Sequence, residues 1–333
     1  MHLRLLSPPS LKPGDTLHVI APSGGLRETA ACEQGLQLWR DRGYNLVLTP
    51  GWNGQHGYLS ARDSQRRQQL YDSFHDPDVK GILCLRGGYG ATRLLENWHW
   101  GVHLPPKWLI GFSDITALLW SLSNEGISGL HAPLLTTLAA EPDWSQQRLF
   151  KWVSGRAIGP IQGQGWGGGR CVGRLFPGNL TVATHLIGTA HEPDLTRAIL
   201  AFEDTGELPY RLDRLLTHWR MSGRFKHIAG IALGRFSRAD VTPGTPSFTI
   251  AEVLRDRLGD LSIPIVSDLP FGHDGVNAAL PVGAIAELDG DAGTLNVTPS
   301  PGRAAVTSAS RAGGFQSPAV RADAVRDNGH ARE

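Results

Sequence analysis

In Trp108-Leu-Ile-Gly-Phe-Ser-Asp-Ile-Thr-Ala-Leu-Leu-Trp-Ser-Leu122, a short apolar run, a turn and a helical pattern follow one another. The run predicts a buried strand, and apolar residues from Ile115 onward recur at the i, i+3, i+4 and i+7 positions of a helix. Ser113 is thus expected on a sharp strand-to-helix turn, where an acyl-transfer nucleophile would be exposed beside free helix amides. Taken alone, the stretch favours a simpler interpretation, in which Ser113 or Asp114 only caps the helix.

Length and composition bound the class of protein. The 333 residues suffice for two domains, and 41% hydrophobic with 19% charged residues fit a soluble globular protein. A formal net charge of +1 provides no field to attract nucleic acid or an anionic membrane. No apolar run is long enough for a bilayer, and Met1 to Pro13 lack the features of a signal peptide. Three distant cysteines argue against a disulfide framework. We therefore expect a cytoplasmic protein without nucleic-acid or membrane partners.

The first half of the chain alternates between strand and helix patterns. Short apolar and β-branched runs predict strands at 17–21, 45–48, 79–85, 108–110 and 126–131. Helical patterns lie between them, at 28–42, up to Phe74, up to Trp98 and at 115–122. This alternation predicts an α/β fold with a flavodoxin-like, mostly parallel sheet and helices on both faces.

The pattern changes after residue 155. A glycine-rich segment at 159–173 precedes helical patterns at 178–187, 209–221 and 249–258, with strands at 198–202 and 227–233 and a hairpin signal at Asp289-Gly290. We expect an N-terminal α/β domain at 1–155 that carries the serine and a smaller, mixed α+β C-terminal domain at 156–300. Residues 301–333 have few large apolar side chains and predict a disordered tail.

Two further turns carry side chains that could complete a catalytic site with Ser113. Glu203 follows a predicted strand, and His273 lies in a glycine-rich loop. A serine hydroxyl needs a neutral imidazole to accept its proton, and the imidazole needs a carboxylate to fix its tautomer. Backbone amides must stabilise the oxyanion, and the natural donors are Asp114 N–H and a glycine N–H of Arg86-Gly87-Gly88. Spacing alone does not show that these groups meet.

Each of these residues also has a simpler interpretation. His273 is one of 13 histidines and by itself favours a turn residue. Glu203 could complement the dipole of the helix that begins near Pro209. Arg86-Gly-Gly-Tyr-Gly90 lacks the full Gly-x-Gly-x-x-Gly pattern, which argues against a nucleotide site. No zinc-site spacing is present, and we expect neither a metal nor a cofactor.

Six segments of the chain, each weak alone, occur together and in order in a known family. They are Leu11-Lys-Pro-Gly-Asp-Thr16 with Ala21-Pro-Ser23, Ile82-Leu-Cys-Leu-Arg-Gly-Gly-Tyr-Gly90, Ile110-Gly-Phe-Ser-Asp-Ile-Thr-Ala117, Gly178-Asn-Leu180, Phe202-Glu-Asp204, and Phe271-Gly-His273 with Leu280-Pro-Val-Gly283. Through them the chain resembles the LD-carboxypeptidase family of serine peptidases, which includes murein tetrapeptide carboxypeptidases and microcin C immunity proteins. It departs from the family at Pro177, where a glycine is usual, and at Phe202, where leucine is commoner.

The resemblance implies a role for single residues. Ser113 corresponds to the family's nucleophile, Glu203 and His273 to its glutamate and histidine, and the amides of Gly88 and Asp114 to its oxyanion hole. It further implies a cytoplasmic homodimer without a metal or cofactor. The implied reaction releases D-alanine from a muropeptide tetrapeptide during cell-wall recycling.

Substrate contacts and two other functions stay open. Arg86 and the amides of its loop, including Gly87, are candidates for binding the terminal carboxylate, and Trp166 for another substrate contact. The same apparatus could hydrolyse aminoacyl or peptidyl nucleotides, as in microcin C immunity proteins, although Gly155 to Gly173 is short for that subgroup's insertion. The sheet could also be a non-enzymatic module that holds a ligand at its carboxyl edge.

Overall fold

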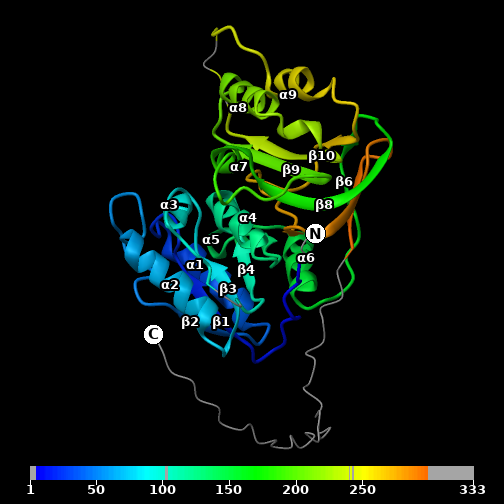
Figure 1. The fold of residues 1–333 in the computed structure, drawn as a ribbon. Coiled ribbons are helices and arrows are strands. Elements are labelled where there is room, and N and C mark those ends of the chain that lie inside the picture. The colour runs from blue at the N-terminus through cyan, green and yellow to red at the C-terminus, as the bar shows by residue number, and fades with distance from the viewer. Residues whose placement is uncertain (1–4, 102–103, 240, 242–243, 299–333) are drawn as a thin grey trace, which may run out of the picture. The chain divides into compact units, whose positions relative to one another are not determined.

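The computed structural model describes residues 5–101, 104–239, 241 and 244–298 (Figure 1). These residues belong to one compact unit, in which both sheets lie. The tail predicted at 301–333 lies outside the described residues. The division into domains at residue 155 stays a prediction.

The first sheet has the strand order β12-β5-β4-β3-β1-β2. All of its neighbouring strands pair in parallel except β5 and β12. The mostly parallel sheet that the alternating pattern predicts is therefore confirmed. Its strands are β1 (Thr16–Ile20), β2 (Asn45–Leu48), β3 (Val79–Cys84), β4 (Trp108–Gly111), β5 (Leu130–His131) and β12 (Leu280–Pro281).

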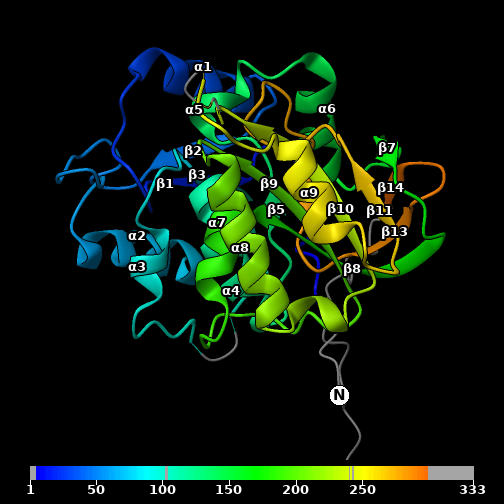
Figure 2. The same ribbon diagram turned by 90° about the horizontal axis from the view of Figure 1, so that it is seen from above.

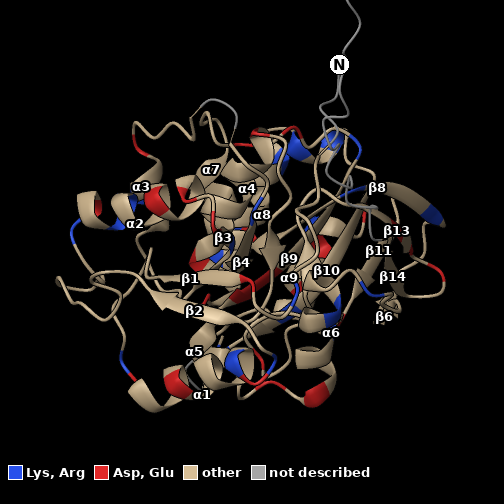
Figure 3. Ribbon diagram, turned by 90° about the horizontal axis from the view of Figure 1, so that it is seen from below, with Lys and Arg blue, Asp and Glu red and all other residues tan. Residues whose placement is uncertain are grey.

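Helices cover both faces of this sheet, because alternate strand residues point to opposite sides. Ile82 of β3 packs in one apolar cluster with Leu70 and Leu118, whereas the adjacent Leu83 packs in another with Leu36. Figure 3 accordingly shows α1 and α5 on one side of β1 and β2, with α2 and α3 on the other. The helices are α1 (Thr29–Arg40), α2 (Asp63–His75), α3 (Ala91–Leu95), α4 (Thr116–Asn124), α5 (Leu135–Leu138) and α6 (Asp143–Val153).

The second sheet has the order β6-β14-β13-β8-β9-β10-β11-β7, with four parallel strands, β8 to β11, at its centre. Antiparallel strands complete both sides. Helices α7, α8 and α9 lie over this sheet (Figure 2). The elements are β6 (Ile161–Gln162), β7 (Gln164–Gly165), β8 (Arg170–Asn179), α7 (Leu180–Leu186), β9 (Ala198–Thr205), α8 (Pro209–Met221), β10 (Gly230–Ser237), α9 (Ile250–Leu258), β11 (Ile265–Ser267), β13 (Ile285–Asp289) and β14 (Thr294–Val297).

Close contacts join the two sheets around α4. Trp120 Nε1 donates to Pro177 O at 2.9 Å. A Cβ on Gly178 would lie only 2.5 Å from Thr116 Cγ2, so a glycine is required for β8 to approach α4 this closely. The carboxyl ends of β4 and β9 are thereby brought near each other. Within the described residues, no helix combines the length and apolarity needed to span a bilayer.

Candidate active site

Ser113 lies where β4 turns into a helix. β4 ends at Gly111, a 3-10 helix (η1, Ser113–Ile115) follows, and α4 begins at Thr116. Ser113 has a φ of 63°, a left-handed conformation that is uncommon outside glycine and points to a functional constraint. Gly111 allows the turn, because a Cβ there would lie 3.0 Å from Cys84 Cβ. The predicted strand-to-helix turn is confirmed.

The side chains of Ser113, His273 and Glu203 form a chain of hydrogen bonds. His273 Nε2 lies 3.0 Å from Ser113 Oγ, and His273 Nδ1 lies 2.6 Å from Glu203 Oε2. A neutral imidazole that donates from Nδ1 to the carboxylate can accept the Ser113 proton at Nε2. Glu203 is fully buried, where its charge acts strongly on the imidazole. The structure thus brings together the three predicted groups, and their part in catalysis stays a prediction.

Asn179 holds the Glu203 carboxylate from the other side. Its Nδ2 donates to Glu203 Oε1 at 3.4 Å and to Asp204 Oδ1 at 2.8 Å. Asp204 also accepts from the N–H and hydroxyl of Thr181. Burial, and next the charge of Glu203, raises the pKa of Asp204 to about 6. From the sequence, Asn179 is recognised only as part of the segment Gly178-Asn-Leu180 and is assigned no role. Its position opposite Glu203 could not be predicted, because it depends on the register of β8 with β9.

Gly272 shows why a glycine precedes His273. Its φ is +133°, and a Cβ there would lie 3.1 Å from Glu203 Cβ and 3.2 Å from Glu203 Oε2. Any other residue would press on the carboxylate that orients His273. The Gly272 N–H donates to Asn277 Oδ1 at 3.3 Å, which ties this loop together.

The loop from Arg86 to Gly90 lies against Ser113. A Cβ on Gly87 would be 3.2 Å from Ser113 Oγ, and Gly88 has a φ of +110°, so both positions favour glycine. Among the described residues, neither the Gly88 N–H nor the Asp114 N–H has a hydrogen-bond acceptor. Free backbone donors beside a nucleophile are what an oxyanion hole requires.

Ser113 and His273 line a pocket of about 490 Å³. Gly87, Gly88 and Arg86 contribute to the same wall. The size suits a small ligand. The pocket also contains charged side chains that the sequence motifs do not mark, namely Arg27, Glu28, Glu141 and Arg238.

Arg86 is half-buried at this pocket, with Nη1 3.3 Å from Gly25 O. Burial, and to a lesser extent the nearby Arg27, lowers the pKa of Arg86. A guanidinium nevertheless keeps its charge at neutral pH. Arg86 and the nearby Arg27 are cations that can bind an anionic ligand group, in a pocket that Glu28 and Glu141 also line.

Trp166 is not among the residues that line this pocket. Its indole N–H donates to Ser267 Oγ at 2.9 Å, and the Arg255 guanidinium lies 3.6 Å from its ring centre. Through these contacts the ring packs between β11 of the second sheet and α9. The substrate contact expected of Trp166 is therefore not found here.

The capping interpretation of this turn is wrong, because neither Ser113 nor Asp114 caps η1 or α4 with its side chain. The buried Asp114 carboxylate instead accepts from Ser23 Oγ at 2.6 Å and from the N–H of Ala91, the first residue of α3, at 2.8 Å. Burial raises the pKa of Asp114, and these hydrogen bonds oppose the shift. Asp114 thus supports the start of a different helix.

The cysteines lie apart from this constellation. Cys32, Cys84 and Cys171 are free. Burial raises the pKa of Cys32 to about 11 and that of Cys84 further, so these thiols stay protonated. In the part of the chain that the structure describes, no group of three His, Cys, Asp or Glu side chains is placed to hold a metal ion.

Two family models match the chain. Residues 17–132 match the N-terminal domain of the LD-carboxypeptidases, and residues 172–288 match their C-terminal domain. Ser113 lies in the first matched segment, and Glu203 and His273 lie in the second.

Whole-chain relatives extend this likeness. A protein of Synechocystis sp., whose own name as a carboxypeptidase is provisional, is 55% identical over 291 residues, 87% of this chain and 97% of that protein. The murein tetrapeptide carboxypeptidase of Pseudomonas aeruginosa is 32% identical over 289 residues, 82% of this chain and 92% of that protein.

Solved structures share the fold. The muramoyltetrapeptide carboxypeptidase from Oxalobacter formigenes has a TM-score of 0.73 at 28% identity, over 84% of this chain and 97% of its own. MccF in complex with glutamyl sulfamoyl guanosine has a TM-score of 0.78 at 22% identity, over 89% of this chain and 99% of its own. At that identity the second likeness concerns the fold alone.

Proposed function

This chain belongs to the LD-carboxypeptidase family, and on that premise we propose that it is a serine carboxypeptidase acting on muropeptides. The observation that carries the proposal is the hydrogen-bond chain from Ser113 through His273 to Glu203, with the serine and histidine on the pocket wall. The bond cleaved is the amide between an L-centre and a terminal D-alanine, and the process served is cell-wall recycling.

The acylation step follows from the geometry. His273 Nε2 takes the Ser113 proton while Ser113 Oγ attacks the carbonyl carbon before the terminal residue. Glu203 fixes the tautomer of the imidazole and stabilises the imidazolium. The N–H groups of Gly88 and Asp114 donate to the oxyanion of the tetrahedral intermediate. On collapse the C–N bond breaks, and His273 gives its proton to the leaving amine.

Deacylation reuses the same groups. A water molecule attacks the ester carbonyl of acylated Ser113, and His273 takes a proton from that water. The bond to Ser113 Oγ then breaks, and His273 returns the proton to the serine. The shortened peptide leaves as a carboxylate.

The terminal carboxylate of the substrate needs a positive partner. Arg86 is our candidate, because it directly precedes Gly87, whose backbone approaches Ser113. Arg27 and Arg238 lie on the same pocket wall and are alternatives. The loop amides, Gly87 included, can add hydrogen bonds to the same group.

Replacing the nucleophile tests the proposal. Ser113→Ala should abolish release of D-alanine from a muropeptide tetrapeptide, measured by chromatography of the free amino acid. The melting temperature should stay near that of wild type. Ser64→Ala, at an exposed serine of α2, is the control and should keep full turnover. Wild-type turnover by Ser113→Ala would show that the nucleophile is another group.

Hydrolysis of aminoacyl or peptidyl nucleotides is the second candidate, favoured by the fold shared with MccF in its complex with glutamyl sulfamoyl guanosine. A nucleobase is usually bound by a stacking aromatic side chain. Phe112 and His273 are the aromatic residues on the described pocket wall, and His273 is assigned to the reaction. Rates on a muropeptide and on an acyl-sulfamoyl adenosine distinguish the two functions, and faster cleavage of the nucleotide would reverse our order.

A third candidate, a ligand-binding module without turnover, predicts tight binding and no labelling of Ser113 by a serine-directed probe. The homodimer rests on the family resemblance alone, whereas the cytoplasmic location rests on the resemblance and on the cysteine pattern of the sequence. Sedimentation velocity of the full chain tests the dimer, and a single species with the mass of one chain would contradict it.

A further inference from the structure

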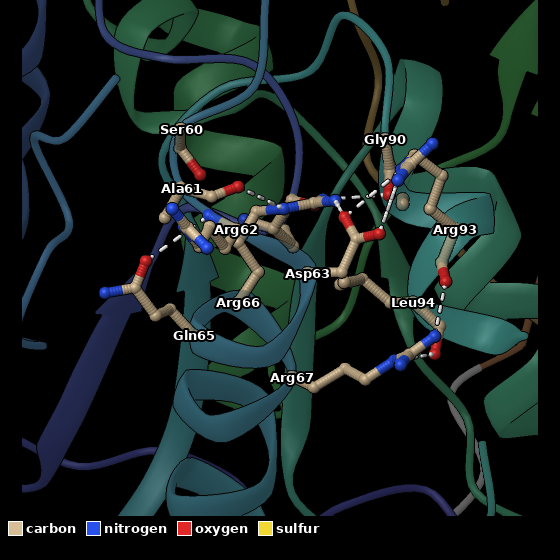
Figure 4. A network of polar contacts seen from close by, with 12 residues as sticks. Ser60, Ala61, Arg62, Asp63, Gln65, Arg66, Arg67, Gly90, Arg93 and Leu94 are labelled. Atoms are coloured by element: carbon tan, nitrogen blue, oxygen red, sulfur yellow. Dashed lines mark hydrogen bonds and ion pairs between the residues drawn. The ribbon is translucent and has the colours of Figure 1, made fainter. Parts of the chain in front are cut away.

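Arg66 is a fully buried arginine that joins several loops beside the pocket (Figure 4). It lies on α2, and its guanidinium donates to the carbonyl oxygens of Pro22, Gly90 and Ala61 and to the Asp63 carboxylate. A charge buried this completely is tolerated only when its donors find partners. The network therefore places a fixed cation where two chain segments meet.

Asp114 binds the same two chain segments, at the residues that directly follow Pro22 and Gly90. Arg66 holds Pro22 and Gly90, whereas Asp114 accepts from Ser23 Oγ at 2.6 Å and from the N–H of Ala91 at 2.8 Å. We call Arg66, Asp114 and the segments Pro22-Ser23 and Gly90-Ala91 the Arg66–Asp114 clamp. One buried cation and one buried carboxyl group thus join the loop after β1 to the end of the loop after β3.

The clamp connects the nucleophile to the loop opposite it. Asp114 directly follows Ser113 in the chain. Gly90 ends the loop whose Gly87 approaches Ser113, and the Gly24 N–H supports that loop by donating to Gly87 O at 3.1 Å. A shift of Pro22 or Gly90 would therefore be passed to Gly87 and Gly88.

We propose that Arg66 is a positioning residue for the oxyanion hole, which holds Pro22 and Gly90 so that the Gly88 N–H stays directed at the reacting carbonyl. This role rests on the proposed function. The loop needs such a support, because Gly88 and Gly90, with φ of +110° and +128°, give it a very free backbone. Oxyanion donors contribute fully only when they are held in place before the reaction.

The shape of the guanidinium matters as well as its charge. Its planar fork reaches three carbonyl oxygens and a carboxylate at once, which a lysine ammonium cannot reproduce from one position. Gly90 fits closely against it, since a Cβ there would lie 2.9 Å from Arg66 Nη1 and 2.5 Å from Leu59 Cδ2.

The test compares Arg66→Lys with Arg67→Lys. Arg67 is the next residue of α2 and also donates to three carbonyl oxygens, but these belong to Arg93, Leu94 and Glu96 around the end of α3. Arg66→Lys should lower kcat for D-alanine release by roughly 10- to 100-fold, the scale expected for a misplaced catalytic group. KM should change little, because oxyanion donors act in the transition state. Arg67→Lys should keep the wild-type kcat. Equal kcat in both variants, or a loss confined to KM, overturns the role of Arg66.

Ser23→Ala keeps the test decisive if Arg66→Lys does not fold. It removes one hydrogen bond of the clamp and leaves Arg66 and Asp114 in place, so kcat should fall on the order of fivefold with KM unchanged. An unchanged kcat in Ser23→Ala would then overturn the proposal. Wild-type protein that neither releases D-alanine nor reacts with a fluorophosphonate at Ser113 contradicts the proposed function itself. An active wild type with an undisturbed Arg66→Lys contradicts only the positioning role.

Discussion

Ser113 and His273 meet at one hydrogen bond but are positioned in different ways. Ser113 lies on a continuous strand, turn and helix, and its neighbour Asp114 anchors the turn. His273 lies in the irregular segment between β11 and β12, where Glu203 binds its ring and Asn277 accepts from the N–H of the preceding Gly272. The backbone turn that presents Ser113 is therefore set by adjacent residues and fixed through Asp114 by Ser23 and Ala91, whereas the ring of His273 is oriented by the distant Glu203.

This difference indicates where substitutions should affect chemistry and where they should affect folding. Near Ser113, the buried side chains of Arg66 and Asp114 join α2, α3 and the loops after β1 and β3. Substitutions there should therefore change the positions of both loops. The hydrogen bonds of His273 mainly orient its own imidazole ring. Substitutions on the His273 side should thus reduce turnover with smaller changes in stability.

The largest effect is expected for Glu203→Gln. Glutamine keeps the size but removes the charge that stabilises the imidazolium, and its NH2 group can donate to Nδ1 and favour the wrong tautomer, so kcat should fall on the order of 10⁴-fold. The control is Glu207→Gln, a nearby carboxylate that contacts Thr181 and Arg211 and should keep kcat near wild type. Comparable turnover of the two variants would remove Glu203 from the mechanism.

Gly272→Ala should have an intermediate effect. The added Cβ would lie 3.0 Å from Arg235 O and 3.1 Å from Glu203 Cβ, on a backbone with φ of +133°, so we expect kcat to fall roughly 10- to 100-fold. Stability should fall by about 1–3 kcal/mol in urea unfolding. Gly126→Ala, with φ of +76° and open space around its Cβ position, isolates the backbone strain. If both variants lose activity equally, contact with Glu203 is not the cause.

The last prediction concerns stability rather than turnover and involves His131, which is fully buried beside the rings of Phe112 and Phe271. Burial lowers its pKa to about 4. Below pH 6.5 the His131 side chain binds a proton in the unfolded chain, whereas in the folded protein it binds one only below about pH 4. The free energy of unfolding should therefore decrease as pH falls from 6.5 to 4, by up to about 3 kcal/mol from this group.

His131→Phe removes this term and should flatten the dependence of unfolding free energy on pH over that range, measured by urea titration at pH 7 and pH 4.5. The raised pKa of Asp204 acts in the opposite direction, because the folded state there keeps its proton up to about pH 6. Asp204 is present in both proteins and cancels in the comparison. Identical slopes for wild type and variant would contradict the assignment.

The sequence predicts best what adjacent residues determine. β2 at Asn45–Leu48 and α8 at Pro209–Met221 have the predicted bounds, because each is one uninterrupted pattern. The turn at Ser113 is predicted for the same reason. Glu203 and His273 are candidates from the sequence alone, but the family resemblance was needed to favour them over the simpler interpretations, since only the fold brings them to that turn.

Features that depend on tertiary contacts were not predictable in this way. Gly178 and Asn179 end β8 although their sequence favours a helix, because β9 pairs with them. Helices α5 and α6 were not predicted from the sequence. Arg66 has an ordinary helical position in the sequence, and only the arrangement of Pro22 and Gly90 around it gives it a distinctive place. Trp166 shows the converse, a residue whose glycine-rich setting predicts a substrate contact but whose ring packs against the Arg255 guanidinium.

The measurement that tests the central claim most directly is peptide mapping by mass spectrometry after treatment with a fluorophosphonate. The probe reacts with a serine only when a base and oxyanion donors activate it. We predict one adduct per chain, on the peptide that contains Ser113, and its loss in His273→Ala. An adduct on another serine, or labelling that persists without His273, would contradict the proposed site.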